Sequence, residues 1–529
     1  MSEQQSAPII RLTEVQARIG KIQQSYASIP NKECNDCKEC EKCKNIRAQE
    51  YQVELITPMF GDTSLIEHQK EVVPVRSAAI RGHLRFWWRA TRGAAYSSVY
   101  DLREREVAIF GDTTTPSRVK ISIEMDDKAE KLDAISAKRL LPYVLFPLRE
   151  TDTPSSSQLL QPFSFRLYIQ YSLPRNSHEL TIVQLKEEVE AALSAWIHFG
   201  GLGGRTRRGC GSLYCKEFSI KRMGNGHVQL QNWYSAWMTK HKLQLLPRGE
   251  YRQWPTLCNE IYSQVPSATH VKEPKIVWKD IILVYQLFRQ QRNKWKQDDS
   301  ETCKFARSLW PEADSIRQIT GMAVEKHSKI CPGDKIRGRY AFPRAQLGLP
   351  IIFKFKSEDC KAKYPLREPY NTELAPVGKT RLASPLILKP IAIDNKKAVG
   401  AIILLNHKPL TALKLETREK YALHEVENKL EHTSISHHHI YPNLTYSRSP
   451  MKAENETSTT CAIAAFLSSV FIKNWMDGKQ NNHEMRTYNS SPSNKQGRTP
   501  SPYQHNNQQQ NRSMKPNSHH RSNKSKGER

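Results

Sequence analysis

Four cysteines close together near the start of the chain could bind a metal: Cys34, Cys37, Cys40 and Cys43. Each pair of neighbours is separated by two residues, and a C-x2-C loop presents two thiolates to one ion. Four such sulfurs can complete a tetrahedral zinc site or supply ligands to an iron–sulfur cluster. Zinc ribbons place about a dozen or more residues between their two pairs, and no proline follows Cys43 as it does in bacterial ferredoxins. We expect zinc first, an iron–sulfur cluster second and metal-free reactive thiols third.

A second chemical signal is the segment 77–93, which combines arginine with tryptophan. A helix turns by about 100° per residue, so its arginines would share an arc of about 80°. These arginines are Arg81, Arg85, Arg89 and Arg92. Ile80, Leu84 and Trp87 form a neighbouring apolar stripe that seats the helix on a core. The guanidinium row predicts a polyanionic partner, and Trp88, nearer the arginines, is predicted to stack on bases.

The same segment contains His83. A histidine beside bound RNA could act as a general base on a ribose 2′-hydroxyl. It could equally contact a phosphate from the helix surface or make a hydrogen bond in the core, and we favour these non-catalytic roles.

A glycine-rich loop at 200–212 alternates glycine with positive charge. Glycines such as Gly203 and Gly204 let the backbone approach a phosphate, while Arg205, Arg207 and Arg208 supply charge. The loop lacks the Gly-Lys-Ser/Thr ending of a P-loop. A tight turn with solvated arginines is the simpler interpretation, but together with the arginine helix we favour contact with RNA.

The elements that must position these residues follow from hydrophobic periodicity. Period-two alternation predicts strands at 51–57, 117–125, 163–169 and 211–220, and helical spacing predicts helices at 77–93 and 181–199. The order strand-helix-strand-strand-helix-strand is that of the ferredoxin-like split βαβ fold. RNA-recognition modules use the same sheet as a platform, so the predicted domain is also RRM-like.

The remainder of the chain predicts a second α+β unit and a tail. Helices are expected at 278–295 and 459–475, and strands at 350–356, 386–393 and 399–405. Beyond about residue 477 the chain is almost free of aliphatic residues, which predicts disorder. The expected organisation is an extension at 1–50, domains at 51–223 and 224–476, and a basic tail at 477–529.

Charge and length narrow the class of protein. The 529 residues exceed one hydrophobic core, and the net charge of +27 is most easily tolerated when a nucleic acid neutralises it. Apolar runs fall well short of the ~18 residues that span a bilayer, so no membrane partner is expected. The first residues lack the pattern of a secretory signal, and the odd number of cysteines, 11, fits a reducing cytoplasm.

Several separated segments resemble the RAMP superfamily of CRISPR proteins, and within it the first subunit of the type III-B effector, the Cmr complex. They are residues 55–61, 77–93, 106–111, the glycine loop, 309–321, 344–353 and 381–390. The resemblance spans residue 51 to about residue 405. It leaves the cysteine-rich extension and the basic tail unexplained.

This resemblance implies two ferredoxin-like domains and a role in crRNA-guided binding and destruction of invading RNA. It implies a non-catalytic subunit that contacts crRNA or target RNA near the crRNA 3′ end, together with other Cmr subunits and without a small-molecule substrate. Because base pairing reads sequence in such particles, its contacts should go to the RNA backbone. The alternative from another class is a metal-independent RAMP-type endoribonuclease with His83 as base.

The cysteine spacing makes a direct prediction about metal content. The full chain, purified under reducing conditions, should contain about one zinc per molecule by elemental analysis. The variant Cys34→Ser/Cys37→Ser should lose that zinc, because two of four thiolates cannot complete the site. Cys360→Ser, a change at an isolated cysteine, should leave the metal content unchanged. Equal metal content in all three proteins would contradict the site.

Overall fold

The computed structural model describes residues 46–62, 74–126, 129–132, 143–145, 157–172, 180–221, 229–264, 270–292, 308–328, 340–355, 364–419, 421–446, 449–452 and 458–479. The predicted cysteine site and the predicted tail beyond residue 479 lie outside these residues. The described helices and strands confirm the α+β class. None of those helices is long and apolar enough to cross a membrane.

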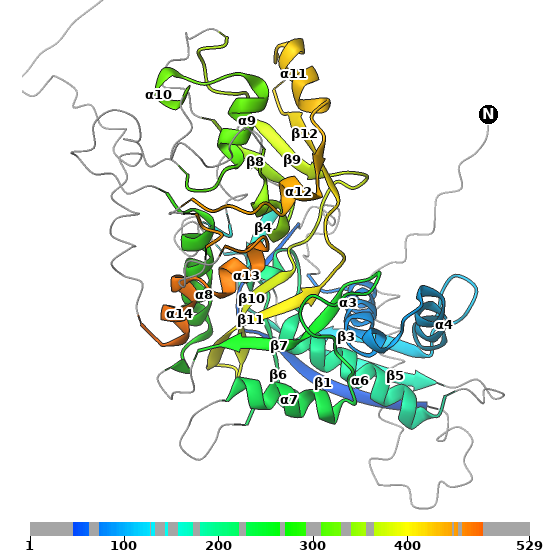
Figure 1. Cartoon of the computed structure of the whole chain (residues 1–529). Coiled ribbons are helices and arrows are strands. Elements are labelled where there is room, and N and C mark those ends of the chain that lie inside the picture. Colours follow the sequence, from blue (N-terminus) through cyan, green and yellow to red (C-terminus); the bar gives the residue numbers. More distant parts are fainter. Residues whose placement is uncertain are drawn as a thin grey trace, which may run out of the picture. The chain divides into compact units, whose positions relative to one another are not determined.

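The first sheet contains four antiparallel strands in the order β3-β5-β1-β6 (Figure 1). Their bounds are Ile46–Leu55 (β1), Val119–Met125 (β3), Ser164–Ser172 (β5) and Leu213–Cys215 (β6). In the chain, α3 (Ser77–Ala90) lies between β1 and β3, and α6 (Ile182–Phe199) lies between β5 and β6. This strand order, with a helix after the first and third strands, is that of the split βαβ motif.

One face of the first sheet is buried against α3 and α6. Strand β5 alternates as expected, with Phe165, Leu167, Ile169 and Tyr171 all fully buried. Helix α6 begins at a capping box in which Thr181 and Gln184 exchange hydrogen bonds, which satisfies backbone donors of the first turn. The opposite face of the sheet carries the polar residues of the alternation.

The second sheet has three strands in the order β10-β11-β7. Strand β7 (Thr256–Ser263) is followed in the chain by α8 (Pro274–Arg289), and later by β10 (Leu386–Ala392) and β11 (Ala398–Asn406). Every residue of β10 and β11 is buried. A second hydrophobic core lies between these strands and α8, which contributes Trp278, Ile281 and Tyr285 to it. Helices α13 (Ala462–Leu467) and α14 (Val470–Met476) also contribute to this core. In chain order the strands are β7, β10 and β11, with α8 after the first of them, and the first strand lies beside the third. The first three strands and the first helix of the split βαβ motif have the same order.

A third sheet, not predicted from the sequence, has the order β13-β12-β9-β8. It comprises β8 (Ile351–Phe353), β9 (Thr372–Pro376), β12 (Ala412–Thr417) and β13 (Ile435–Ser436). With α9 (Glu312–Thr320) and α11 (His424–Glu431) it has a hydrophobic core of its own. Its segments lie between α8 and β10 and after β11, so a single α+β unit does not describe residues 224–476 fully. Strand β8 lies within the strand predicted at 350–356. Strands β9, β12 and β13 were not predicted, because strands this short carry too few alternating residues to be found by periodicity.

The remaining described elements are short. They are β2 (Met59–Asp62), β4 (Ser157–Leu160), α4 (Val99–Phe110), α7 (Leu230–Lys240), α10 (Glu325–Ser328), α12 (His437–Ile440), and the 3₁₀ turns η2 (Arg92–Ala95), η4 (Thr206–Arg208), η5 (Lys216–Phe218) and η7 (Pro343–Leu347). The expected helix at 459–475 is broken in two, because the Ser469 hydroxyl accepts from the Ile472 amide and caps α14. The strand expected at 211–220 ends at Cys215 because the chain turns into η5.

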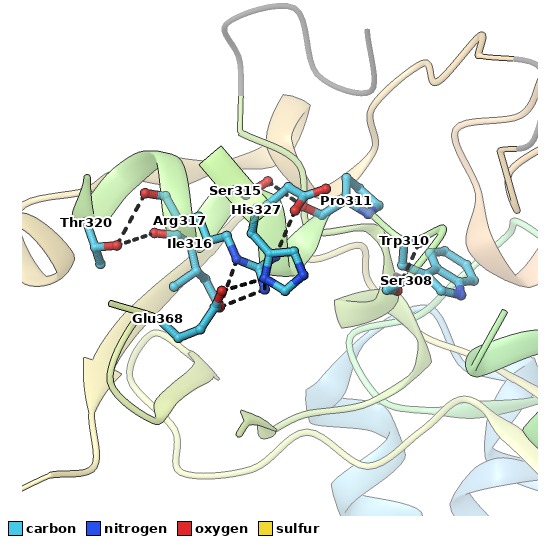
Figure 2. A network of polar contacts seen from close by, with 10 residues as sticks. Ser308, Trp310, Pro311, Ser315, Ile316, Arg317, Thr320, His327 and Glu368 are labelled. Atoms are coloured by element: carbon cyan, nitrogen blue, oxygen red, sulfur yellow. Dashed lines mark hydrogen bonds and ion pairs between the residues drawn. The ribbon is translucent and has the colours of Figure 1, made fainter. Parts of the chain in front are cut away.

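The third core contains a buried ionic network (Figure 2). Arg317 on α9 donates to Asp314 at 2.9 Å and to Glu368 at 2.7 Å, and both carboxylates are almost fully buried. His327 approaches the second oxygen of Glu368. Burial raises the pKa of Glu368, but the hydrogen bond from His327 and the charge of Arg317 together hold it below its usual 4.5.

Removing this carboxylate should destabilise the third core. At pH 7, Glu368→Gln should lower the free energy of unfolding by about 3 kcal/mol, because it leaves a buried guanidinium with one carboxylate instead of two. The folded pKa of Glu368 lies below the unfolded value, so its contribution exists above pH 4.5 and is lost as the pH falls through the folded pKa. Urea unfolding should therefore show the two proteins converging in acid. A constant difference at all pH values would contradict the ionic role.

Lys389, in the middle of β10, is fully buried and links the first and second cores. Its Nζ donates to the Gly200 carbonyl at the C-terminal end of α6, at 2.6 Å. Burial lowers the pKa of Lys389 from 10.5 to about 7. Lys389 therefore caps the C-terminal end of α6 from inside the protein. Because it is buried, its amino group loses a proton near neutral pH.

Lys389→Met should remove a pH dependence of stability. Between about pH 7 and pH 10.5 the unfolded chain keeps a proton on Lys389 that the folded chain has released. The free energy of unfolding of the native protein should therefore rise with pH in this window, by up to about 1.4 kcal/mol per pH unit. Urea unfolding of the Met variant should lack that rise. Parallel curves for the two proteins would show that Lys389 is charged in the folded state at all these pH values.

Candidate nucleic-acid interface

Three members of the predicted arginine row lie on α3, and the fourth, Arg92, begins η2, because the helix predicted at 77–93 ends at Ala90. Three of the four arginines are paired with carboxylates. Arg85 Nε and Arg89 Nη1 each lie 2.6 Å from the same oxygen of Glu106 on α4. Arg92 Nε lies 4.0 Å from Glu188 on α6. Glu106 is 5 % exposed, so these ion pairs are screened from water on the carboxylate side. The charge of this part of the row is largely balanced within the protein.

Two arginines at the start of α3 remain available to a ligand. Arg81 is partly exposed and Arg76, which precedes the helix, is exposed. Neither of them has a carboxylate partner among the residues that the structure describes. The first turn of α3 contains no acidic residue, and Arg76 provides no side-chain cap for its backbone donors. Positive charge therefore gathers at this helix end, where the helix dipole adds to it.

The prediction that Trp88 stacks on bases is wrong for this fold. Trp88 is fully buried, and its indole N–H donates to Glu188 at 2.8 Å. Trp87, expected in the core, is also buried at 4 % exposure. Helix α3 is covered by more than one neighbour, since Trp88 also lies against Tyr96 and Phe110. A base has no access to either ring.

The open face of the first sheet does not match an RNA-binding platform. Outward positions on β1 and β3 include Glu50, Glu54 and Glu124. Arg166 on β5 is engaged by Glu124 at 2.7 Å and by Asp126 at 3.1 Å. An excess of carboxylates repels a phosphate backbone. The RRM-like use of this face is therefore disfavoured by its charge.

The glycines of the loop serve close packing of the backbone. The Gly204 amide donates to the Phe60 carbonyl at 2.5 Å, and a Cβ on Gly203 would collide with the same oxygen. Gly209 has a φ of +80°, and a Cβ there would lie 2.7 Å from the Trp278 ring. Gly203 and Gly204 thus pack on β2, and Gly209 packs on α8. These contacts occupy the space that a phosphate cradle would need at Gly203 and Gly204.

The loop arginines point toward the second core. Arg207 donates to the carbonyl of Ser384, and Arg208 donates to the carbonyl of Leu386 at 2.8 Å. Burial lowers the pKa of Arg207 to about 10. The guanidinium of Arg205 lies 5.3 Å from the centre of the Phe60 ring. Arg207 and Arg208 therefore join the loop to the start of β10 instead of extending into solvent.

The two basic segments predicted from the sequence do meet. The Arg207 guanidinium lies 5.9 Å from the centre of the Phe86 ring on α3. At the start of the loop, a Cβ on Gly200 would lie 2.6 Å from the Trp87 indole nitrogen. Helix α3 and the glycine loop are thus in contact, and aromatic side chains of α3 make that contact.

His83 packs against an aromatic ring on the neighbouring helix. Its imidazole is stacked on Trp196 of α6, with ring centres 5.8 Å apart and planes 14° apart. Burial lowers its pKa below 6.5, so the ring is neutral at pH 7. The stacking on Trp196 shows that the side chain contributes to the α3–α6 contact.

Sequence reasoning missed the groups that face the loop from the second core. Tyr285 on α8 lies against Arg208, and Arg289, at the end of the same helix, lies against the same tyrosine ring. Tyr143, which belongs to none of the elements predicted from the sequence, contacts Tyr285. A lone arginine at the end of an apolar helix gives no sequence signal, because its neighbours are set by tertiary packing. Among the described residues no three His, Cys, Asp or Glu side chains gather as a metal site.

Comparison of sequences connects part of the chain with known proteins. Residues 52–214 match the RAMP superfamily. The CRISPR system Cmr subunit Cmr1-1 of Pyrococcus furiosus is 29 % identical over 170 residues, which cover 31 % of this chain and 46 % of that subunit. Subunit Cmr1-2 of the same organism is 28 % identical over 182 residues, which cover 31 % of this chain and 92 % of that subunit. The match thus spans about half the length of the first relative.

Comparison with solved structures also finds chains from two Cmr structures. The crystal structure of apo Cmr1 from Pyrococcus furiosus superposes with a TM-score of 0.37 and 16 % identity, covering 74 % of this chain and 94 % of that one. A chain of the cryo-EM structure of the type III-B Cmr-beta bound to cognate target RNA gives a TM-score of 0.37 and 14 % identity, covering 73 % and 98 %. The resemblance found in the sequence is confirmed by the family match and the two Cmr1 sequences: residues 52–214 match the RAMP superfamily, and part of the chain is similar to Cmr1 subunits of CRISPR systems.

Proposed function

We propose that this chain is a non-catalytic, RNA-binding subunit of a type III-B Cmr effector complex. In that role it acts in the cytoplasm in crRNA-guided defence against invading RNA, contacts crRNA or target RNA near the crRNA 3′ end, and assembles with other Cmr subunits. The observation that carries the proposal is the match of residues 52–214 to the RAMP superfamily together with the sequence similarity of the chain to two subunits named Cmr1.

The charge of the chain supports an RNA partner. A net charge of +27 favours a polyanion, and phosphate contacts by arginine and lysine give affinity without reading sequence. The acidic sheet face and the paired arginines of α3 restrict where that contact can occur. Arg81 is the member of the predicted row that a phosphate can reach, and Arg76, which was not predicted, lies beside it at the start of α3.

The role of His83 supports a subunit that binds RNA without cutting it. A general base must reach the 2′-hydroxyl proton and be held in orientation. In this fold the imidazole is packed against the Trp196 ring, which is an aromatic neighbour and not a carboxylate that would orient a base. Stabilising the α3–α6 contact is sufficient to explain its position.

We also propose zinc as the metal bound by Cys34, Cys37, Cys40 and Cys43, on the basis of their spacing alone. Such a site would stabilise the extension that precedes the RAMP domain. The site would supply structure and not chemistry to the RNA-binding role.

Charge reversal at the start of α3 should weaken RNA binding. Arg81→Glu should lower the affinity of the full chain for a short single-stranded RNA, because it replaces an attraction to phosphate by repulsion. The slope of log affinity against log salt should become shallower by about 0.7 for each phosphate that the variant no longer neutralises. Fluorescence anisotropy at several salt concentrations measures both quantities.

Lys120→Glu is the matched control, because Lys120 is exposed on β3 of the acidic sheet. It changes the net charge equally but should leave the salt slope unchanged. Equal effects of the two variants would contradict contact at α3. Cleavage of labelled RNA by the native protein in chelator, abolished in His83→Ala, would replace the binding role with the endoribonuclease alternative.

A further inference from the structure

Several partly buried arginines of the described chain are balanced by carboxylates. Arg317 has Glu368 (Figure 2) and also Asp314, and Arg344 has Glu312 at 3.0 Å. Arg85 and Arg89 share Glu106 in the same way. This pattern is expected, because taking a guanidinium out of water without a counter-charge costs several kcal/mol.

Arg208 and Arg289 depart from the pattern. Arg208 donates to two carbonyl oxygens, of Leu386 and of its neighbour Arg207, and to the Tyr285 hydroxyl at 2.9 Å. The Arg289 guanidinium lies over the ring of Tyr285, and Tyr143 acts electrostatically on it. Within the described part of the chain, neither guanidinium is in ion-pair contact with a carboxylate. Among the described residues, no carboxylate contact therefore balances either positive charge.

The two guanidinium groups share one aromatic ring. The central carbons of Arg208 and Arg289 lie 4.5 Å and 5.6 Å from the centre of the Tyr285 ring. Burial alone raises the pKa of Tyr285, but the charges of Arg208 and Arg289 outweigh it and hold the pKa below 10. The local potential therefore favours a negative charge at this point.

Further positive charge surrounds the pair. Arg344 and Arg205 both act electrostatically on Tyr143, as do Arg208 and Arg289. The carboxylate that acts on Arg289, Glu312, is already bound by the side chain and the backbone amide of Arg344. Among these described groups, the Glu312 carboxylate, already bound to Arg344, is thus outnumbered by guanidinium groups.

Rigid elements hold these groups in place. Arg208 belongs to η4 of the glycine loop. Its backbone carbonyl accepts a 2.6 Å hydrogen bond from the indole N–H of Trp278. Arg289 ends α8, and Tyr285 on the same helix is fully buried against Phe466. A site whose donors are fixed before binding loses little entropy on binding an anion.

We propose that Arg208 and Arg289, with the Tyr143 hydroxyl beside them, form a binding site for one phosphate group. The fork of a guanidinium matches two oxygens of a phosphate, and two forks with a hydroxyl can satisfy a tetrahedral oxyanion. The inference rests on the proposed function only in taking that phosphate from RNA, either as a terminal phosphate or as an internal phosphodiester.

The test compares Arg289→Gln with Arg248→Gln in the full chain. Arg248 is exposed, so its loss removes the same charge outside the site. Three RNAs of identical sequence carry a 3′-phosphate, a 5′-phosphate or hydroxyls at both ends. Arg289→Gln should weaken binding by about tenfold or more, the loss expected for charge-assisted hydrogen bonds, and Arg248→Gln by about twofold or less. Circular dichroism establishes that both variants are folded.

The RNA ends identify the source of the phosphate. A preference of the native protein for one phosphorylated end that disappears in Arg289→Gln assigns the site to a terminal phosphate. Equal weakening for all three RNAs assigns it to an internal phosphodiester. Arg289→Gln and Arg248→Gln behaving alike with every RNA overturns the proposal.

A measurement on the native protein covers the case in which Arg289→Gln fails to fold. Inorganic phosphate should raise the midpoint of thermal unfolding above that in chloride at equal ionic strength, because ligand binding stabilises the folded state. The absence of any phosphate-specific rise overturns the site. A phosphate-specific rise in a native protein that binds none of the RNAs supports the site and refutes the proposed function, so the two failures are distinguishable.

Discussion

The position of the glycine loop between the first and second hydrophobic cores is the constraint on which the rest of the described structure depends. Positive φ values at Gly203 and Gly209 let the backbone approach β2 and α8. Arg207 and Arg208 donate to carbonyl oxygens just before and at the start of β10. Lys389 on β10 in turn donates to the Gly200 carbonyl at the start of the loop. Basic side chains of the loop and of β10 therefore join the two cores.

Charge compensation separates arginines that hold the fold from arginines that can bind a ligand. On α3, Glu106 and Glu188 balance the inner members of the row, so their guanidinium groups cross-link helices. At the start of the same helix, and beside Tyr285, positive charge has no such balance within the described residues. An RNA strand responds to the net potential and not to the number of arginines. The arginines without a carboxylate partner among the described residues are therefore the ones that can attract a polyanion.

Hydrophobic patterns in the sequence were sufficient for the longer elements, whether one face is buried, as in β5, or every residue is buried, as in β10 and β11. Strands β1, β5, β10 and β11 and helices α3, α6 and α8 all fall where alternation or helical spacing predicts them, within a few residues. Trp88 shows the limit of that reasoning, because the sequence gives one apolar stripe and cannot show that α4 and α6 cover a second side of α3. Its partner Glu188 is 100 residues away. In the third sheet β8 lies within the strand predicted at 350–356. Strands β9, β12 and β13 were missed for a different reason, since two to six residues barely define a period.

The same limit explains why the candidate site could be found only in part. The charge of the glycine loop is evident in the sequence, so Arg208 could be predicted from it as a candidate for phosphate contact. Whether that charge is free depends on carboxylates and cations brought in from other elements. Arg289 comes from a helix whose other marked feature is its apolar face, and it adds charge where Glu312 is already committed to Arg344. An excess of charge is a property of a folded neighbourhood, and it is this excess that distinguishes the pair around Tyr285 from the more conspicuous row on α3.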